Sequence, residues 1–176
     1  KCLIGGHLFA IVTARGHHPS SIRRVVSYFI KTVLTDDDRK LMLKNLRTFA
    51  NDFDEKLNDK QLLMNYLNEC EYIGVSHPDF IKKYNTPSSN SPEEGKKLAI
   101  KKFVERVSEY YGKLALKYPD VSISLGFSDD DLKTIGSVKE LFESELITEH
   151  PHIKFVLYDT SDKNKTGGNK IIITKK

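Results

Sequence analysis

Three groups of side chains in this sequence have types and spacing that suit chemistry on a charged substrate. In chain order they are Thr13, Ala14, Arg15 and Gly16; Lys96 and Lys97; and Asp129, Asp130 and Asp131. A hydroxyl and backbone N–H groups can bind phosphoryl oxygens, an ammonium group neutralises their charge, and carboxylates hold hard cations such as Mg²⁺. The combination predicts a site for a phosphate held together with Mg²⁺.

The elements that must position these groups follow from the apolar patterning. Short apolar runs bounded by turn residues predict strands over 7–14, 120–127, 153–160 and 169–176. Apolar residues at helical spacing predict helices over 22–34, 35–53, 58–69, 91–118 and 132–147. This order is typical of a parallel sheet with helices on its faces, in which ligands bind beyond the carboxyl ends of the strands. Thr13 and Asp129 stand at such strand ends.

The segment 32–90 contains more helix than a simple crossover between two strands needs. We therefore expect 1–31 and 91–176 to form an α/β core with a Rossmann-like parallel sheet, and 32–90 to be a helical insertion or cap. The opening residues resemble the tail of a helix that ends at Gly5 and Gly6. We expect the sequence to begin partway through an element.

The quoted motifs and their order resemble the haloacid dehalogenase (HAD) superfamily of phosphohydrolases. "FAIVTARG" is similar to the second motif of that family, "GKKLAIKKF" to the third and "VSISLGFSDDDLKTIGSVKELF" to the fourth. The resemblance implies a HAD-like fold in which the hydroxyl of Thr13 and the residues that follow it bind the substrate phosphate. It implies that Lys96 is the lysine of the third motif, with Lys97 as its neighbour, and that some subset of the aspartates at 129–131 binds Mg²⁺.

Two departures from the family pattern affect the expected function. The first motif, an Asp-x-Asp at the end of the first sheet strand that supplies the nucleophile, does not precede Thr13 in these residues and would lie before Lys1. In the fourth motif, the common Gly-Asp pair is replaced by Gly126 and Phe127. The resemblance implies a Mg²⁺-dependent phosphatase that forms an aspartyl-phosphate on an upstream aspartate. The alternative is a HAD-derived binding or regulatory domain without catalysis.

The composition narrows the classes of partner. The 28 Lys and Arg against 24 Asp and Glu give a net charge of +4, a weaker excess than a nucleic-acid surface normally carries. Lysines gather in 163–176, so action near nucleic-acid ends is a third and weaker hypothesis. No apolar run reaches the roughly 18 residues of a membrane span. Cys2 and Cys70 are far apart in the sequence and offer neither a metal-ligand spacing nor a disulfide framework, so we expect a cytoplasmic protein. The expected partner is a phosphorylated substrate, either a small molecule or a macromolecule.

The histidines give no metal site by spacing alone. His17 and His18, and likewise His150 and His152, lack the helix or strand spacing that would direct both rings to one ion. No zinc site is predicted from them.

Overall fold

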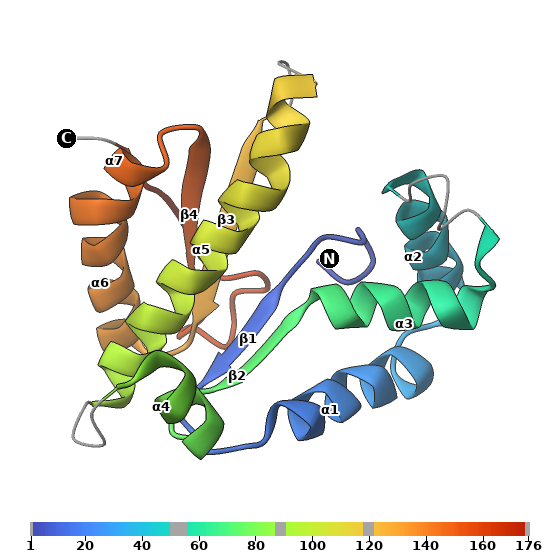
Figure 1. Ribbon diagram of the computed structural model, residues 1–176, viewed down its shortest axis with the longest axis horizontal. Helices are drawn as coiled ribbons and strands as arrows, with labels where there is room; N and C mark the ends of the chain where they lie inside the picture. The colour runs from blue at the N-terminus through green and yellow to red at the C-terminus, as the bar shows by residue number, and fades with distance from the viewer. Residues whose placement is uncertain (1, 50–55, 87–90, 118–121, 175–176) are drawn as a thin grey trace. The chain divides into compact units, whose positions relative to one another are not determined.

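A computed structural model describes residues 2–49, 56–86, 91–117 and 122–174. These residues form two compact units, 1–90 and 91–176, and each unit is described by itself (Figure 1). Parts of four predicted elements lie outside the described residues: the ends of the helices over 35–53 and 91–118, the start of the strand over 120–127 and the end of the strand over 169–176.

The first unit is built around two parallel strands. Its elements are β1 (Ala10–Thr13), α1 (Pro19–Thr32), α2 (Asp36–Phe49), α3 (Asp59–Glu69), β2 (Glu71–Gly74) and α4 (Pro78–Tyr84). The pairing runs from Ala10 opposite Glu71 to Thr13 opposite Gly74, and Figure 1 shows the two strands side by side. Both strands therefore end at the same edge.

Local sequence signals start the helices of the first unit. The side chain of His18 accepts the N–H of Ser20, and Pro follows at the first helical position of α1. Asn58 caps α3 in a capping box with Gln61. Apolar faces of the helices and strands bury one core cluster, made of Val26, Ile30, Met42, Leu46, Leu62, Tyr66, Leu67, Cys70 and Tyr72.

The second unit packs helices against a three-stranded sheet. Its elements are α5 (Pro92–Lys117), β3 (Ile123–Asp129), α6 (Leu132–Leu141), η2 (Phe142–Leu146), α7 (Ile147–Glu149), β4 (Ile153–Asp159) and β5 (Asn169–Ile172). β3 and β4 are parallel, in register from Ile123 opposite Ile153 to Asp129 opposite Asp159, and β5 is antiparallel to β4. The fully buried Phe142 and Leu157 belong to its core.

The helical run that begins at Leu132 contains one π turn, η2, between α6 and α7. In a π turn, the hydrogen-bonded ring closes over five residues rather than four. Phe142 and Leu146, the first and last residues of η2, are 0% and 1% exposed. Both ends of the π turn therefore lie in the core of the second unit.

The mixed α/β class with parallel strand pairs is confirmed, but the strands form two sheets rather than one. β2 lies outside the predicted strands, and it pairs with β1 inside the first unit. β5 is antiparallel because the short connection from Asp159 contains no crossover helix and turns back through Gly167 and Gly168, which have φ of +86° and +69°. The HAD-like arrangement and the assignment of 32–90 as an insertion stay predictions.

Among the helices of the described residues, none is both long enough and apolar enough to cross a membrane.

Candidate functional site

In the second unit, a lysine of α5 meets the carboxyl end of β3. Lys96 Nζ lies 3.3 Å from Asp129 Oδ2, and the two side chains are only 17% and 16% exposed. Lys96 stands in the first turns of α5, and Asp129 is the last residue of β3. The structure therefore brings together one predicted lysine and one predicted aspartate in a partly water-excluded ion pair.

A buried hydroxyl extends this ion pair into a short network. Thr134 in α6 is 3% exposed, and Lys96 Nζ donates to its Oγ1 at 3.4 Å. Thr134 Oγ1 in turn donates to Asp131 Oδ2 at 3.0 Å. The lysine is thus held by groups from the strand end and from the helix that follows it.

The three predicted aspartates occupy different environments. Asp129 is partly buried, and its Oδ1 accepts the N–H of Asp131 at 3.0 Å. Asp131 caps α6, since its Oδ1 accepts the N–H of Lys133 at 2.9 Å, and the hydrogen bonds from Lys133 and Thr134 lower its pKa. Asp130 is exposed. Asp129 is therefore the aspartate that pairs with Lys96, whereas Asp131 caps the N-terminus of α6.

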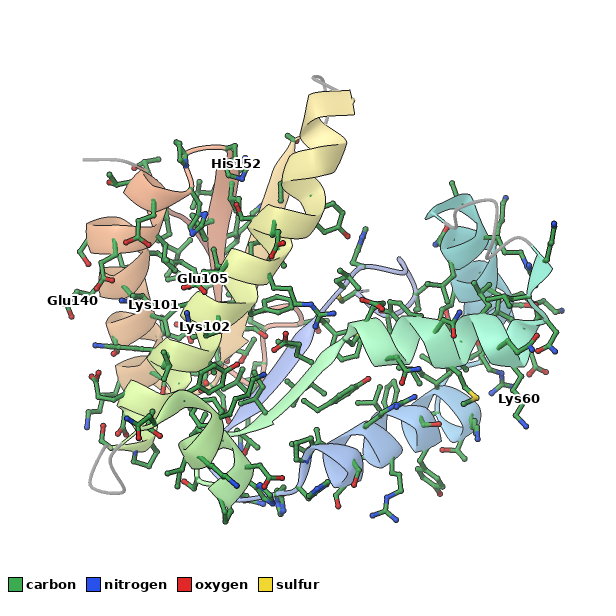
Figure 2. All side chains as sticks on the ribbon, viewed as in Figure 1. Lys60, Lys101, Lys102, Glu105, Glu140 and His152 are labelled. Atoms are coloured by element: carbon green, nitrogen blue, oxygen red, sulfur yellow. The ribbon has the colours of Figure 1, made fainter. Side chains whose placement is uncertain are left out.

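The second predicted lysine has a local partner. Lys97 Nζ lies 3.5 Å from Glu94 Oε1, three residues earlier on the same helix. Figure 2 labels Lys101, Lys102 and Glu105 farther along α5, where Lys101 pairs with Glu145 and Lys102 with Glu105 at 2.7 Å. Of these four lysines of α5, Lys96 is the one placed against the end of β3.

Asp159 is an acidic residue at the same sheet edge that was not predicted. It ends β4 directly opposite Asp129 in the parallel register. Hydrogen bonds from the hydroxyl and N–H of Ser161 lower its pKa, with the N–H at 2.9 Å from Oδ1. The N–H of Thr160 donates to the backbone oxygen of Asp129 at 3.0 Å, which joins the two strand ends. An acid directly after the apolar run at 153–158 is the signal that could have identified it.

In the first unit, the predicted phosphate-binding residues form a loop that is hydrogen-bonded to the residues that follow β2. Thr13 Oγ1 accepts the N–H of Arg15 at 3.2 Å, and Ser76 Oγ donates to the backbone oxygen of Ala14 at 2.7 Å. The N–H of Val75 donates to the backbone oxygen of Thr13 at 3.0 Å. Because Thr13 Oγ1 is an acceptor in the loop, its own O–H remains a donor for a ligand.

Close approach of two backbones holds this loop in place. A Cβ added at Gly74 would lie 2.4 Å from the backbone oxygen of His17 and 2.8 Å from that of Arg15. Only glycine leaves room there. Arg15 and Gly16 are exposed, and Thr13 and Ala14 are half-buried. The loop therefore presents its turn to solvent while its base is fixed.

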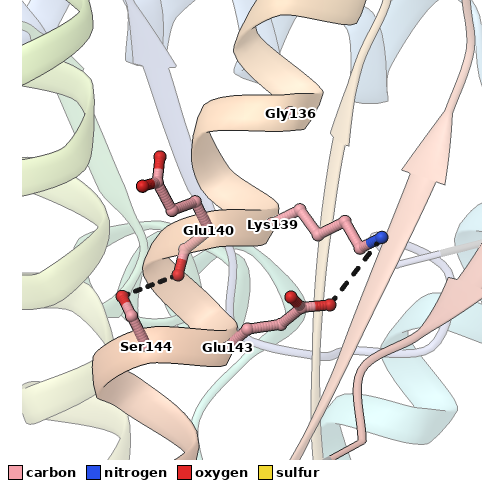
Figure 3. Close-up of a pocket in the computed structure, with 5 residues that line it drawn as sticks. All are labelled: Gly136, Lys139, Glu140, Glu143 and Ser144. Carbon is pink, nitrogen blue, oxygen red and sulfur yellow. Dashed lines mark hydrogen bonds and ion pairs between the residues drawn. The ribbon is translucent and has the colours of Figure 1, made fainter. Parts of the chain in front are cut away.

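A surface hollow of about 420 Å³ lies along α6 and η2 (Figure 3). Its lining residues are Gly136, Lys139, Glu140, Glu143 and Ser144. Lys139 Nζ lies 3.7 Å from Glu143 Oε1, and Ser144 Oγ donates to the backbone oxygen of Glu140. These are ordinary contacts within one helix, and none of the predicted site residues lines the hollow.

Comparisons of the chain with protein-family models, with curated proteins and with solved structures found no match.

Proposed function

We propose that this chain carries the phosphate-binding and cation-binding residues of a Mg²⁺-dependent phosphohydrolase that works through an aspartyl-phosphate. The observation that supports the proposal best is the contact of Lys96 with Asp129 at the carboxyl end of β3. A lysine held beside a strand-end carboxylate, with little exposure to water, suits the neutralisation of a phosphoryl group. Lys97, which pairs within its own helix, fits this role less well.

The carboxylates at the edge of β3 and β4 fit a magnesium ion. Asp129 and Asp159 end neighbouring parallel strands in register, and oxygen ligands are those that Mg²⁺ prefers. Both oxygens of Asp131 accept hydrogen bonds at the start of α6. Asp129 holds the N–H of Asp131 at Oδ1 and Lys96 at Oδ2, so the ion would share this carboxylate with those donors and take Asp159 or the exposed Asp130 as a further ligand. When bound, Mg²⁺ would neutralise charge on the phosphoryl oxygens.

The other residues have roles in binding and orientation. In this proposal, the O–H of Thr13 and the N–H groups of Ala14 and Gly16 are the phosphate donors of the first unit, whereas the N–H of Arg15 donates to Thr13 Oγ1 and its guanidinium supplies an exposed positive charge. The nucleophile is an aspartate of an upstream Asp-x-Asp. Its carboxylate oxygen bonds to phosphorus as the bond to the leaving oxygen breaks, and water then hydrolyses the acyl phosphate.

The test is hydrolysis of p-nitrophenyl phosphate and a panel of phosphate esters by the full-length protein, with and without Mg²⁺. We expect turnover that requires Mg²⁺, a loss of about 100-fold or more in Lys96→Met, and a change under about twofold in the matched Lys97→Met. Absence of turnover on the whole panel with Mg²⁺ present would refute the phosphatase proposal.

A non-catalytic binding or regulatory domain is the second candidate, because no Asp-x-Asp precedes Thr13 in the 176 residues and Gly126-Phe127 replaces the common Gly-Asp pair. Reading the residues encoded before Lys1 separates the two candidates. An apolar strand that ends in Asp-x-Asp favours the enzyme. Its absence, together with binding of inorganic phosphate without turnover, favours the binding domain.

A further inference from the structure

The first unit repeats one local arrangement at the ends of its two parallel strands. After β1, His18 and Pro19 start α1, and after β2, His77 and Pro78 start α4. Since β1 and β2 are parallel neighbours, both histidines emerge at the same edge. Their ring centroids lie 5.1 Å apart, with the ring planes at 85° to each other.

Asp79 completes a cluster with these two rings. Its Oδ2 lies 3.9 Å from His18 Nε2 and 3.6 Å from His77 Nδ1. One ligand atom from each residue lies within 4.8 Å of the other two. In a tetrahedral zinc site with bonds of roughly 2.0–2.2 Å, ligand atoms are about 3.4 Å apart. Small rotations of these side chains therefore bring the three atoms to coordination distance.

We propose that His18, His77 and Asp79 bind a divalent transition-metal ion, with zinc as the best match. Two imidazole nitrogens and one carboxylate oxygen form a ligand set that suits zinc, whereas magnesium and calcium prefer oxygen ligands throughout. Three protein ligands leave the fourth position to water or to a ligand from solution. The site lies in the first unit and does not depend on the magnesium site proposed at the end of β3.

The hydrogen bonds of the two rings show how each nitrogen becomes available. His18 Nδ1 lies 2.7 Å from Ser20 Oγ. The same Nδ1 accepts the N–H of Ser20 at 3.1 Å. Binding of the ion at Nε2 therefore requires the tautomer with its proton on Nδ1, which gives up this cap of α1 and donates to the Ser20 hydroxyl instead, the usual outer contact of a metal-bound histidine. His77 Nδ1 accepts the N–H of Asp79 at 3.2 Å. The ion and the start of α4 therefore compete for the same lone pair.

The cluster is accessible from solvent. The side chains of His18 and Asp79 are 55% and 71% exposed, and that of His77 is 17% exposed. His77 thus provides the fixed ligand, while the other two can adjust around the ion. Such a site exchanges its metal readily and keeps an open coordination position.

Titration of Zn²⁺ into the metal-free 176-residue chain by isothermal calorimetry tests the proposal. The variants His18→Asn and His77→Asn remove the imidazole but keep a side-chain oxygen that can cap the helix. Asp79→Asn removes the charged ligand with little change of shape. We expect one strong site per chain, at least about tenfold weaker in each of the three variants.

Histidines outside the cluster are the controls. His17→Asn changes the neighbouring residue of the same loop, and His152→Asn changes a ring of the second unit whose Nε2 lies 3.0 Å from Ser108 Oγ. Both controls should bind zinc within about twofold of the unchanged chain. Zinc should also raise the melting temperature of the unchanged chain more than that of His77→Asn. Absence of strong zinc binding, equal binding by all variants, or loss confined to His152→Asn would overturn the proposal.

Discussion

Replacing Lys96 by methionine tests the reading of the ion pair at the end of β3. Two unit charges 3.3 Å apart attract by about 5 kcal/mol at an effective dielectric constant of about 20, before desolvation is subtracted. Exposed pairs are worth about 0–1 kcal/mol, and breaking a fully buried pair costs about 3–5 kcal/mol. Because both partners are about one-sixth exposed, we expect Lys96→Met to lower the free energy of unfolding by about 2–3 kcal/mol.

Urea unfolding followed by far-UV circular dichroism measures this loss, since the sequence has no tryptophan for fluorescence. Lys97→Met is the matched control, because Lys97 pairs with a Glu94 that is 60% exposed, and it should cost about 0.5 kcal/mol or less. A double-mutant cycle with Asp129→Asn isolates the pair itself. Equal losses for the two lysine variants, or a coupling below about 0.5 kcal/mol, would refute the assigned role of Lys96.

Three further predictions concern two tyrosine hydroxyls of the first unit, two glycines and one helix start. Tyr66 donates its hydroxyl to a backbone oxygen at 2.6 Å, whereas the buried hydroxyl of Tyr72 has no partner among the described residues. Tyr66→Phe should therefore cost about 1–2 kcal/mol and Tyr72→Phe should be neutral or stabilising in urea unfolding, and the reverse order would contradict the assignment. Gly74→Ala should cost about 2 kcal/mol or more, because its Cβ would lie 2.4 Å from a backbone oxygen of the loop after β1; Gly136→Ala, with open space on α6, should stabilise by about 0.5–1 kcal/mol. Equal melting temperatures for Gly74→Ala and Gly136→Ala would contradict the steric restriction assigned to Gly74. Because hydrogen bonds lower the pKa of Asp131 in the folded state, its ionised carboxylate contributes stability above the unfolded pKa of about 4, and this is lost as the pH falls through the folded pKa. Asp131→Asn keeps a capping side chain, so the difference in unfolding free energy between the unchanged chain and this variant should shrink from pH 6 to pH 3. A difference that stays constant with pH would refute the stabilising role of the ionised Asp131 carboxylate.

The helices and the meeting of Lys96 with a strand-end aspartate follow from patterns that the sequence carries locally. Apolar spacing sets the buried face of each helix, and strand ends of a parallel sheet share an edge. The choice between Lys96 and Lys97 does not follow from the sequence, because adjacent helical residues point about 100° apart and the pattern does not fix which one faces the sheet. That choice depends on how α5 packs against β3.

Contacts that depend on strand pairing could not be predicted from local sequence patterns. β2 begins with Glu71, ends in Gly74 and lacks the alternation of apolar and polar residues that predicts a strand. Once β1 pairs with it, His18 and His77 meet across 59 positions of the chain, a contact that spacing within either segment cannot reveal. In contrast, the antiparallel direction of β5 was within reach, because the connection at 160–168 is too short for a crossover.

The π turn at Phe142–Leu146 has a consequence for changes in chain length. Its wider ring holds one more residue than a regular turn, so the turn has the geometry of a single-residue insertion in an α-helix. Deleting the exposed-side residue Ser144 would let the run from Leu132 to Glu149 become a regular helix, at the cost of rotating Leu146 relative to Phe142. Within the run from Leu132 to Glu149, a deletion of one residue is therefore expected to be accommodated at this turn.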